Sequence, residues 1–344
     1  MGRGLRLSGW DPVFFISHLL FLGVSYSIYL APHIAPSTFP YFGFIPIIYP
    51  ILVLVNFIVI VFLFWRRAPY AILFLLLSIG LYFPLVKTYQ FFGKEVSTEP
   101  DFKLITLNGQ YLRKPGFVEF FNKEKADVVL LQEVYWRNET FENLKDSAFS
   151  DYYHEKHSLI QIFSKYPIIE FKKIFSGENS TIGLAAYADL DTGKDTLRII
   201  NIYLEPMLID KKLVKESIND METAEANSIV LKNKLTKGFL LHEKQIKQLI
   251  PYITGSKHPV ILAGDLNSVP NSYEYQQISY WLNDPYPKLG KKPGTSFHDF
   301  KYPLRLDYIF HSDEFLPTRY QVINNVKLSD HYPVMAEFKL PVTN

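Results

Sequence analysis

Several apolar runs of the chain end abruptly on carboxylate or amide residues, and the clearest example is Gly-Asp-Leu-Asn at 264–267. The run 260–263 is entirely aliphatic, and Asp265 and Asn267 follow it two positions apart. In an extended strand that spacing sends both side chains to the same side. A rigid strand end that delivers a carboxylate and an amide to one point is suited to orienting a reacting water and the group it attacks.

The same pattern recurs at four more places along the chain. The residues concerned are Asn108 in FKLITLN, Glu133 in VVLLQE, Asp307 in RLDYIF, and Asp330 with His331 in KLSDHYPV. Each fragment alone could be an accident or a structural carboxylate, so the interpretation rests on the ordered set. Because ligands of layered α/β folds gather where strand ends converge, we expect these side chains to share one site.

These residue types are the ones that phosphoester hydrolysis requires. Glu133 and Asp330 are hard oxygen ligands that suit Mg²⁺ or Mn²⁺. Phosphoryl transfer needs positioning and charge stabilisation more than a covalent nucleophile, and amides such as Asn108 and Asn267 can supply neutral hydrogen bonds. The set therefore predicts metal-assisted hydrolysis of a phosphoester.

A second group in the set can handle protons. His331 paired with Asp307 could act as a general base or as a hydrogen-bond donor to phosphate, and both roles stay open. Asp265 is then left to orient or deprotonate the attacking water. Asn267 would fix the position of that water or of a phosphoryl oxygen.

The elements that must position these residues begin at about residue 101. There the chain changes to short runs rich in Ile, Val, Leu, Phe and Tyr, several of them continuously apolar, as in strands covered on both faces. The runs are FKLITLN, ADVVLLQEV, LIQIFSKYPII, IGLAAYADL, TLRIINIYLE, PVILAGDLN, RLDYIFHS and VMAEFKL. Helices are predicted at about 116–125, 140–149, 208–254 and from 271. This alternation indicates a layered α/β domain.

The first hundred residues differ in kind, because they contain three long uncharged runs at about 13–31, 41–64 and 68–86. Each is long enough to span a bilayer as a helix. A cleaved signal peptide would account for only one of them, and buried helices of a soluble core are a poor fit to three in succession. We predict a membrane domain at 1–93 with three transmembrane helices, a linker at 94–100 and a catalytic domain at 101–344.

Positive charges beside these runs predict an orientation. Arg3 and Arg6 precede the first run, and Arg66 and Arg67 lie between the second and third, whereas 32–40 has neither Lys nor Arg. Since basic residues concentrate on the cytoplasmic side, the amino terminus is expected inside and the catalytic domain outside the cytoplasm. Lys87 and Lys94 weakly oppose this orientation.

Composition excludes some classes of site. There is no cysteine, so disulfides, thiolate metal sites and cysteine nucleophiles are all ruled out. The chain has 36 Lys and Arg against 34 Asp and Glu. Proteins that hold long nucleic acids by their phosphates usually show a basic excess, and none is evident here. This balance slightly favours a small or lipidic substrate.

Over about residues 101–341 the chain resembles the endonuclease/exonuclease/phosphatase superfamily, whose fold is called deoxyribonuclease I-like. The resemblance rests on the ordered motifs LN, QE, SKYPI, GDLN, LDYIF and SDHYPV. With its apolar front end, the chain resembles a membrane-anchored bacterial branch. The resemblance implies a four-layered α/β sandwich preceded by three transmembrane helices, with the site at one end of two packed sheets. It also implies these roles: Glu133 as principal metal ligand with Asn108 and Asp330 nearby, Asp265 and Asn267 at the water, and Asp307 paired with His331.

One departure from the superfamily pattern concerns Tyr203. Much of the superfamily has His in a stretch such as Asn-x-His-Leu, where this chain has NIYLEP, and Pro206 stands where relatives often carry a polar residue. A phenol can donate a hydrogen bond without being charged. We hypothesise that Tyr203 donates to a non-bridging phosphate oxygen or to the leaving oxygen; the alternative is an aromatic residue that only packs within its strand.

Taken together, the sequence and the resemblance predict a membrane-anchored phosphoesterase that uses Mg²⁺ or Mn²⁺ on phosphodiesters or phosphomonoesters. The expected partners are the lipid bilayer and a substrate such as nucleic acid, a nucleotide or a phospholipid headgroup. The expected location is the bacterial inner membrane, with the catalytic domain extracytoplasmic. The alternatives are a non-catalytic relative that binds a phosphorylated ligand or a partner protein, and a transporter in which the apolar helices do the work.

Overall fold

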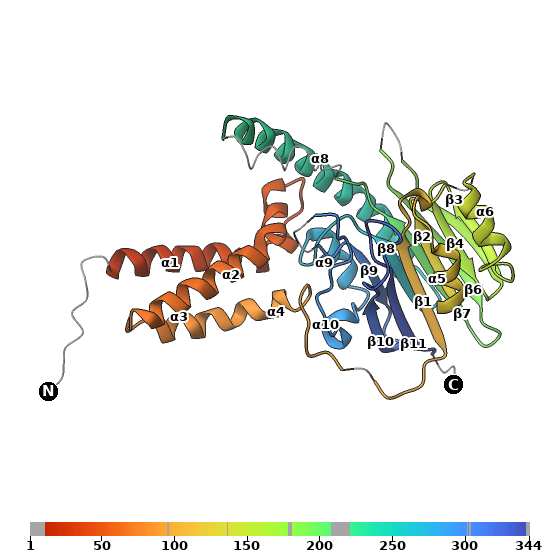
Figure 1. Cartoon of the computed structure of the whole chain (residues 1–344), viewed down its shortest axis with the longest axis horizontal. Coiled ribbons are helices and arrows are strands. Elements are labelled where there is room, and N and C mark those ends of the chain that lie inside the picture. The colour runs from red at the N-terminus through yellow and green to blue at the C-terminus, as the bar shows by residue number, and fades with distance from the viewer. Residues whose placement is uncertain are drawn as a thin grey trace.

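The computed structural model describes residues 11–94, 96–135, 137–177, 181–207, 221–300, 302 and 304–341. Figure 1 shows two parts, an elongated bundle of helices and a wider α/β domain. We call the bundle, residues 11–85, the stem. Arg3 and Arg6, which entered the prediction of orientation, lie outside the described residues.

Two sheets form the centre of the α/β domain. The six-stranded sheet has the order β10 (Leu316–Val322), β11 (Val334–Lys339), β1 (Phe102–Asn108), β2 (Val128–Gln132), β4 (Ile160–Ser164), β3 (Tyr153–His157). The five-stranded sheet has the order β5 (Ile168–Phe175), β6 (Leu184–Asp191), β7 (Thr196–Tyr203), β8 (Val260–Asp265), β9 (Asp307–His311). Among the strands of the described residues, only β1 with β2 and β7 with β8 pair in parallel.

Three apolar clusters show that the domain has four layers. Residues of both sheets, such as Leu104, Leu130 and Ile199, share the cluster between them. The outer face of the six-stranded sheet packs against α5 (Phe117–Glu124) and α6 (Glu139–Asp146). The outer face of the other sheet packs against α8 (Met221–Thr254) and α9 (Tyr273–Ser279). The predicted α/β sandwich is confirmed, and Figure 1 shows the helices on the outside of the paired sheets.

All eight predicted strand runs contain a strand, although the run LIQIFSKYPII joins β4 to the first two residues of β5, and the rest of β5 was not predicted. The sequence also missed β3 and β10. Both are edge strands of the six-stranded sheet. An edge strand faces solvent and carries polar residues, so it lacks the continuous apolar run that marked the others. Of the helix predicted at 208–254, the part at 208–220 lies outside the described residues, and α8 accounts for the rest. The short α10 (Tyr286–Leu289) was not predicted.

The stem consists of three helical passes that run side by side (Figure 1). Its elements are α1 (Asp11–Tyr26), η1 (Ser27–Tyr29), η2 (Ala31–His33), η3 (Pro40–Gly43), α2 (Phe44–Trp65), α3 (Ala71–Ser78), η4 (Ile79–Leu81) and α4 (Tyr82–Leu85). The helical segments Pro12–His33 and Pro40–Trp65 are long and apolar enough to cross a membrane.

The third pass corrects the prediction of three membrane-spanning helices. Its apolar helix covers only Ala71–Leu85 and changes to a 3-10 turn at Ile79–Leu81. At 1.5 Å per residue it reaches about 22 Å, which is short of the roughly 30 Å hydrocarbon core of a bilayer. The uncharged run 68–86 is longer than this helix because residues 68–70 belong to the turn that follows Arg67.

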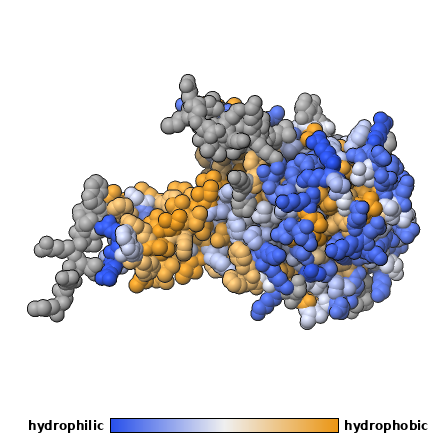
Figure 2. Space-filling view, in the orientation of Figure 1, coloured by the Kyte–Doolittle hydropathy of each residue, from blue (hydrophilic) through white to orange (hydrophobic). Residues whose placement is uncertain are grey.

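Figure 2 shows that hydrophobic residues cover the visible face of the stem and give way to a largely hydrophilic surface on the α/β domain. Among the exposed side chains of the stem are Phe57, Ile58, Trp65 and Ile72, each more than half exposed. Aliphatic and aromatic side chains exposed in such numbers are costly in water. The stem therefore has the surface of a segment that lies in lipid or against another apolar surface.

Hydrogen bonds from several stretches join the stem to the α/β domain. Ser37 donates from its backbone nitrogen and its hydroxyl to the Glu243 carboxylate, at 2.7 and 2.8 Å. Lys87 lies just beyond the stem, and its carbonyl accepts a hydrogen bond from Arg305 of the α/β domain at 2.9 Å. Arg305 also donates to Asp284 at 2.6 Å, and its side chain is 0% exposed. A buried guanidinium needs such partners. These contacts pack the end of the stem against the α/β domain.

Candidate active site

The predicted site residues gather at one end of the two sheets because of the directions in which the strands run. Asn108 ends β1 and lies beside Gln132, the last residue of the parallel strand β2, so Glu133 follows at the same edge. In the other sheet Tyr203 pairs with Asp265 in register, and Asp265 pairs with Asp307. Parallel neighbours end at the same edge and an antiparallel neighbour begins there.

The chain turns sharply as it leaves these strands. Glu133 has φ 52° and Asn267 has φ 45°, in the left-handed region that non-glycine residues rarely occupy. Gly264 has φ 145°, and a Cβ there would lie 1.9 Å from the Ile202 carbonyl oxygen, so only glycine fits. Unusual backbone of this kind concentrates at functional sites.

These turns also change the explanation for Asp265 and Asn267. Strand β8 ends at Asp265, so the two-residue alternation of a strand does not reach Asn267. Instead the Asn267 backbone nitrogen donates to Oδ1 of Asp265 at 2.7 Å, and its side-chain amide donates to the Leu204 carbonyl at 2.9 Å. A local turn, and not strand geometry, brings the Asn267 backbone to the Asp265 carboxylate.

Glu133 is held by two donors. Its Oε1 accepts from the Asn108 amide nitrogen at 3.1 Å and from the Tyr203 hydroxyl at 2.7 Å. Tyr203 is only 1% exposed. Burial, followed by the charges of Glu133 and Asp265, raises the pKa of the Tyr203 hydroxyl far above its usual value, so it stays protonated and donates. Its partner in this structure is thus a carboxylate, where we predicted a phosphate or leaving oxygen.

His331 lies between two buried carboxylates. Its Nδ1 is 2.7 Å from Oδ2 of Asp307, and its Nε2 is 3.9 Å from Oδ2 of Asp265. Burial alone would lower the pKa of His331, but Asp307 and Asp265 raise it to about 10. Burial and the Asp307 charge raise the pKa of Asp265 to about 7, against the opposing effect of His331. The predicted pairing of Asp307 with His331 is present, with the imidazole favoured in its protonated form.

Asp330 is held through a residue that the sequence analysis missed. Gln110 donates from Nε2 to Oδ2 of Asp330 at 2.9 Å, and its backbone nitrogen donates to Oδ1 of Asn108 at 3.1 Å. The Ser329 hydroxyl donates to the Asn108 carbonyl at 2.6 Å. The only sequence signal for Gln110 was its place two residues after a strand-end amide, so its side chain could not be assigned.

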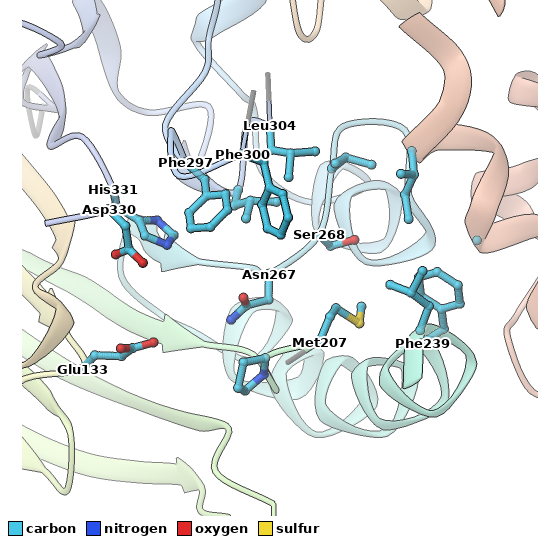
Figure 3. A pocket seen from close by; sticks show the side chains of 16 residues that line it. Glu133, Met207, Phe239, Asn267, Ser268, Phe297, Phe300, Leu304, Asp330 and His331 are labelled. Carbon is cyan, nitrogen blue, oxygen red and sulfur yellow. The ribbon is translucent and has the colours of Figure 1, made fainter. Parts of the chain in front are cut away.

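Among the described residues of the site, two groups of side chains could hold a cation, and they differ in chemistry. Ligand atoms of Asp265, Asp307 and His331 lie within 4.8 Å of one another. In that group, however, His331 and Asp307 already bond to each other, and a protonated imidazole offers no lone pair. Glu133 and Asp330 are half-buried carboxylates that point into the same cavity (Figure 3). They fit a hard divalent cation better.

Asn108 lies beside this second group with its amide nitrogen toward Glu133 and Asp265 and its oxygen toward the Gln110 backbone. In this orientation Asn108 holds the carboxylates of Glu133 and Asp265 in place. One buried atom nearby, Oδ1 of Asp307, has no hydrogen-bond partner within the described part of the chain. An unsatisfied buried carboxylate oxygen marks a site where a polar group of a ligand or a water belongs.

The site opens into a cavity of about 270 Å³. Glu133, Asn267, Asp330 and His331 line one end of it, and Figure 3 shows these side chains pointing into the space between the strand ends. The rest of the lining is mainly apolar. The arrangement can therefore hold a polar, anionic group at one end and bury an uncharged group at the other.

Comparison with known protein families gives two matches. Residues 105–331 match the Endonuclease/Exonuclease/phosphatase family, and residues 11–89 match a domain of unknown function, DUF8431. The first match spans every predicted site residue. No curated protein matches the chain.

Among solved structures, an endonuclease/exonuclease/phosphatase from Beutenbergia cavernae DSM 12333 is 16% identical, with a TM-score of 0.50, over 71% of this chain and 72% of that one. A humanized D. rerio TDP2 is 17% identical, with a TM-score of 0.49, over 69% and 98%. The mannosyl-6-phosphatase Bt3783 of Bacteroides thetaiotaomicron is 19% identical, with a TM-score of 0.48, over 69% and 99%. At such identities the Beutenbergia structure shows a shared fold and nothing about substrate.

Proposed function

The chain belongs to the endonuclease/exonuclease/phosphatase family, and from that premise we propose that it is a membrane-anchored, divalent-metal-dependent phosphoesterase. One observation carries the proposal. A carboxylate pair, Glu133 and Asp330, and a proton-handling group, Asp265, Asp307 and His331, meet at one end of the two sheets. Binding of a phosphorylated ligand alone would not require both groups.

The cation would be Mg²⁺ or Mn²⁺, held by Glu133 and Asp330 with Asn108 beside them. When bound, such a cation would neutralise charge on the phosphoryl oxygens. The geometry that supports this is the pair of carboxylates in the cavity and the donors that fix each of them. Tyr203 then acts as a positioning residue, because its hydroxyl touches Glu133.

The reacting phosphate would be bound by His331 and Asn267. His331 is held by Asp307 through Nδ1, so its Nε2 is left to donate to a phosphoryl oxygen. Asp265, whose pKa is raised to about 7, would take the proton of the attacking water, since a general base works best with a pKa close to the working pH. The water oxygen bonds to phosphorus as the bond between phosphorus and the leaving oxygen breaks, and the leaving oxygen takes up a proton.

The stem would anchor this site in the bacterial inner membrane with the α/β domain outside the cytoplasm. Two of its helical segments have the required length and hydropathy. The turn that carries Arg66 and Arg67 lies at the end of the stem away from the α/β domain (Figure 1), which supports the orientation through the positive-inside rule. We propose the boundaries 1–93, 94–100 and 101–344 for the membrane, linker and catalytic parts.

Hydrolysis by the purified full chain tests this function. The substrates are p-nitrophenyl phosphate, bis-p-nitrophenyl phosphate, DNA, RNA, sphingomyelin and inositol phosphates, each with Mg²⁺, Mn²⁺ or EDTA. We expect turnover that EDTA abolishes and that Glu133→Gln and Asp265→Asn each reduce by at least about a hundredfold. Turnover that survives EDTA, or that both variants retain, would refute the assigned site.

A further inference from the structure

The cavity that holds the candidate site extends well beyond it into an apolar chamber. Its far walls are formed by side chains from four separate parts of the chain, namely Ile47, Leu235 with Phe239, Val269, and Phe300 with Leu304. Leu235 and Phe239 are 5% and 4% exposed and belong to α8. A phosphoester bound at His331 and Asn267 would therefore have a large uncharged space directly beside it (Figure 3).

The stem supplies one wall of this chamber. Gly43 and Ile47, from the end of η3 and the first turn of α2, line it. Gly43 packs so closely on Phe239 that a Cβ at this position would lie 2.6 Å from the ring. The Tyr302 hydroxyl donates to the Ile47 carbonyl at 2.6 Å, which ties the stem to the 297–306 segment on the other side. The chamber thus needs both the stem and the α/β domain.

The chemistry of the lining restricts what can fill it. The charged groups among the described lining residues are Glu133, Asp330 and His331, all at the site end, and that lining includes no Lys or Arg. A nucleic acid strand extending from the site would carry further phosphates into a space without basic partners. A sugar would find few donors and acceptors for its hydroxyls. An alkyl chain would lose no hydrogen bonds there.

The chamber also lies beside the surface of the stem that is suited to lipid. Ile48, the next residue after Ile47, is exposed, and so are Ile51, Leu54 and Val55 further along α2. In Figure 2 the apolar surface on the visible face of the stem continues up to the α/β domain. A molecule whose tail is dissolved in the bilayer would meet the chamber at the end of the stem.

We propose that the substrate is an amphipathic phosphoester from the membrane, with its phosphate at His331 and Asn267 and its alkyl chain in the chamber between α8 and the start of α2. This inference rests on the proposed phosphoesterase function and names its substrate class. It also makes the stem part of the substrate site. The stem therefore determines which substrates the site accepts as well as where the protein is anchored.

Two homologous series of substrates test the inference on the full chain held in amphipol. One consists of alkyl p-nitrophenyl phosphates and the other of alkyl monophosphates, from methyl to hexadecyl. Burial of one CH₂ group changes affinity about fourfold, so kcat/KM should rise by more than about a hundredfold between methyl and octyl and then level off when the chamber is full.

Ile47→Trp narrows the chamber from the stem side, and Ile48→Trp is its matched control because Ile48 is exposed on the same helix. We expect Ile47→Trp to lower kcat/KM for octyl esters about tenfold or more relative to kcat/KM for the methyl ester. Ile48→Trp should leave both alone. Leu235→Trp fills the same chamber from α8, and its turnover of the methyl ester reports that the variant is folded.

The possible failures are distinguishable. If methyl and octyl esters give equal kcat/KM, or if Ile47→Trp and Leu235→Trp leave the preference for octyl intact, the chamber holds no alkyl chain and this inference is overturned while the phosphoesterase stands. The inference is likewise overturned if general phosphoesters are hydrolysed but neither alkyl series is. If nothing is hydrolysed with any metal, the proposed function itself fails.

Discussion

Tyr203 donates its hydroxyl hydrogen to Oε1 of Glu133 across 2.7 Å, and so links the end of one sheet to the carboxylate that follows the other. Strand register explains this contact. Tyr203 is the last residue of β7 and pairs with Asp265 of β8, so it lies at the end of the sheet where the polar side chains gather. The phenol is buried and uncharged, and it orients a carboxylate that we assign to the metal. Residues that orient metal ligands affect metal affinity as well as turnover.

Tyr203→Phe should therefore raise the metal concentration needed for half-maximal activity by about tenfold, with kcat at saturating metal much less affected. The measurement is turnover of a p-nitrophenyl ester across a series of Mg²⁺ or Mn²⁺ concentrations. Tyr187→Phe is the matched control, since the Tyr187 hydroxyl donates to Glu170 at 2.7 Å in the same sheet, away from the site. A large loss of kcat with no change in metal requirement would show instead that Tyr203 acts on the phosphate.

Asp307 and His331 should behave as a unit because the 2.7 Å contact at Nδ1 links them directly. We expect Asp307→Asn and His331→Gln each to lower kcat by about a hundredfold to ten-thousandfold. The double variant should lose little more than the worse single variant, as is usual for residues that work together. Multiplicative losses in the double variant would mean that the two side chains act independently.

Glu274 should make stability depend on pH in the acid range. It is buried with Oε1 2.8 Å from Nδ1 of His242. Burial alone would raise the pKa of Glu274, but the hydrogen bond and charge of His242 lower it below its usual value. A carboxyl group whose pKa is lowered by folding stabilises the fold above its unfolded pKa, about 4.3, and that contribution is lost as the pH falls through the folded pKa.

Thermal unfolding between pH 3 and pH 7 measures this effect. Glu274→Gln should be less stable by about 3 kcal/mol at pH 7, the usual cost of breaking a buried pair, and the difference from the unchanged chain should shrink below about pH 4.5. A stability difference that stays constant with pH would show that Glu274 contributes through packing and not through its charge.

The absence of cysteine makes the orientation of the stem directly measurable. Pro69→Cys, in the turn after Arg67, should react with a membrane-impermeant maleimide only after the cytoplasmic side is opened, whereas Ser97→Cys should react in intact cells from outside the inner membrane. The first cysteine is the control for the second. The opposite pattern would place the α/β domain in the cytoplasm.

Short sequence patterns were sufficient to predict that several of these polar residues lie together. Asp265, Asp307 and His331 follow or begin apolar runs, and the rule that such ends converge predicted that they lie together. In the structure their ligand atoms lie within 4.8 Å of one another. The pairing of Asp307 with His331 was predicted and is present. Sequence missed Gln110 because its role depends on a contact with Asp330, which lies 220 positions further along the chain.

The sequence by itself determined the succession of apolar strands and polar strand ends, since burial of strands requires apolar runs and a shared site requires polar residues where those runs stop. It also showed that the first hundred residues differ from the rest of the chain in their long uncharged runs. Tertiary structure decided the partner of Tyr203, the turn that joins Asn267 to Asp265, and the shortened third pass of the stem. It alone revealed that Ile47 of the stem and Phe239 of α8 enclose one chamber with the site. Contacts between segments so distant along the chain arise from packing, which no local pattern of residues records.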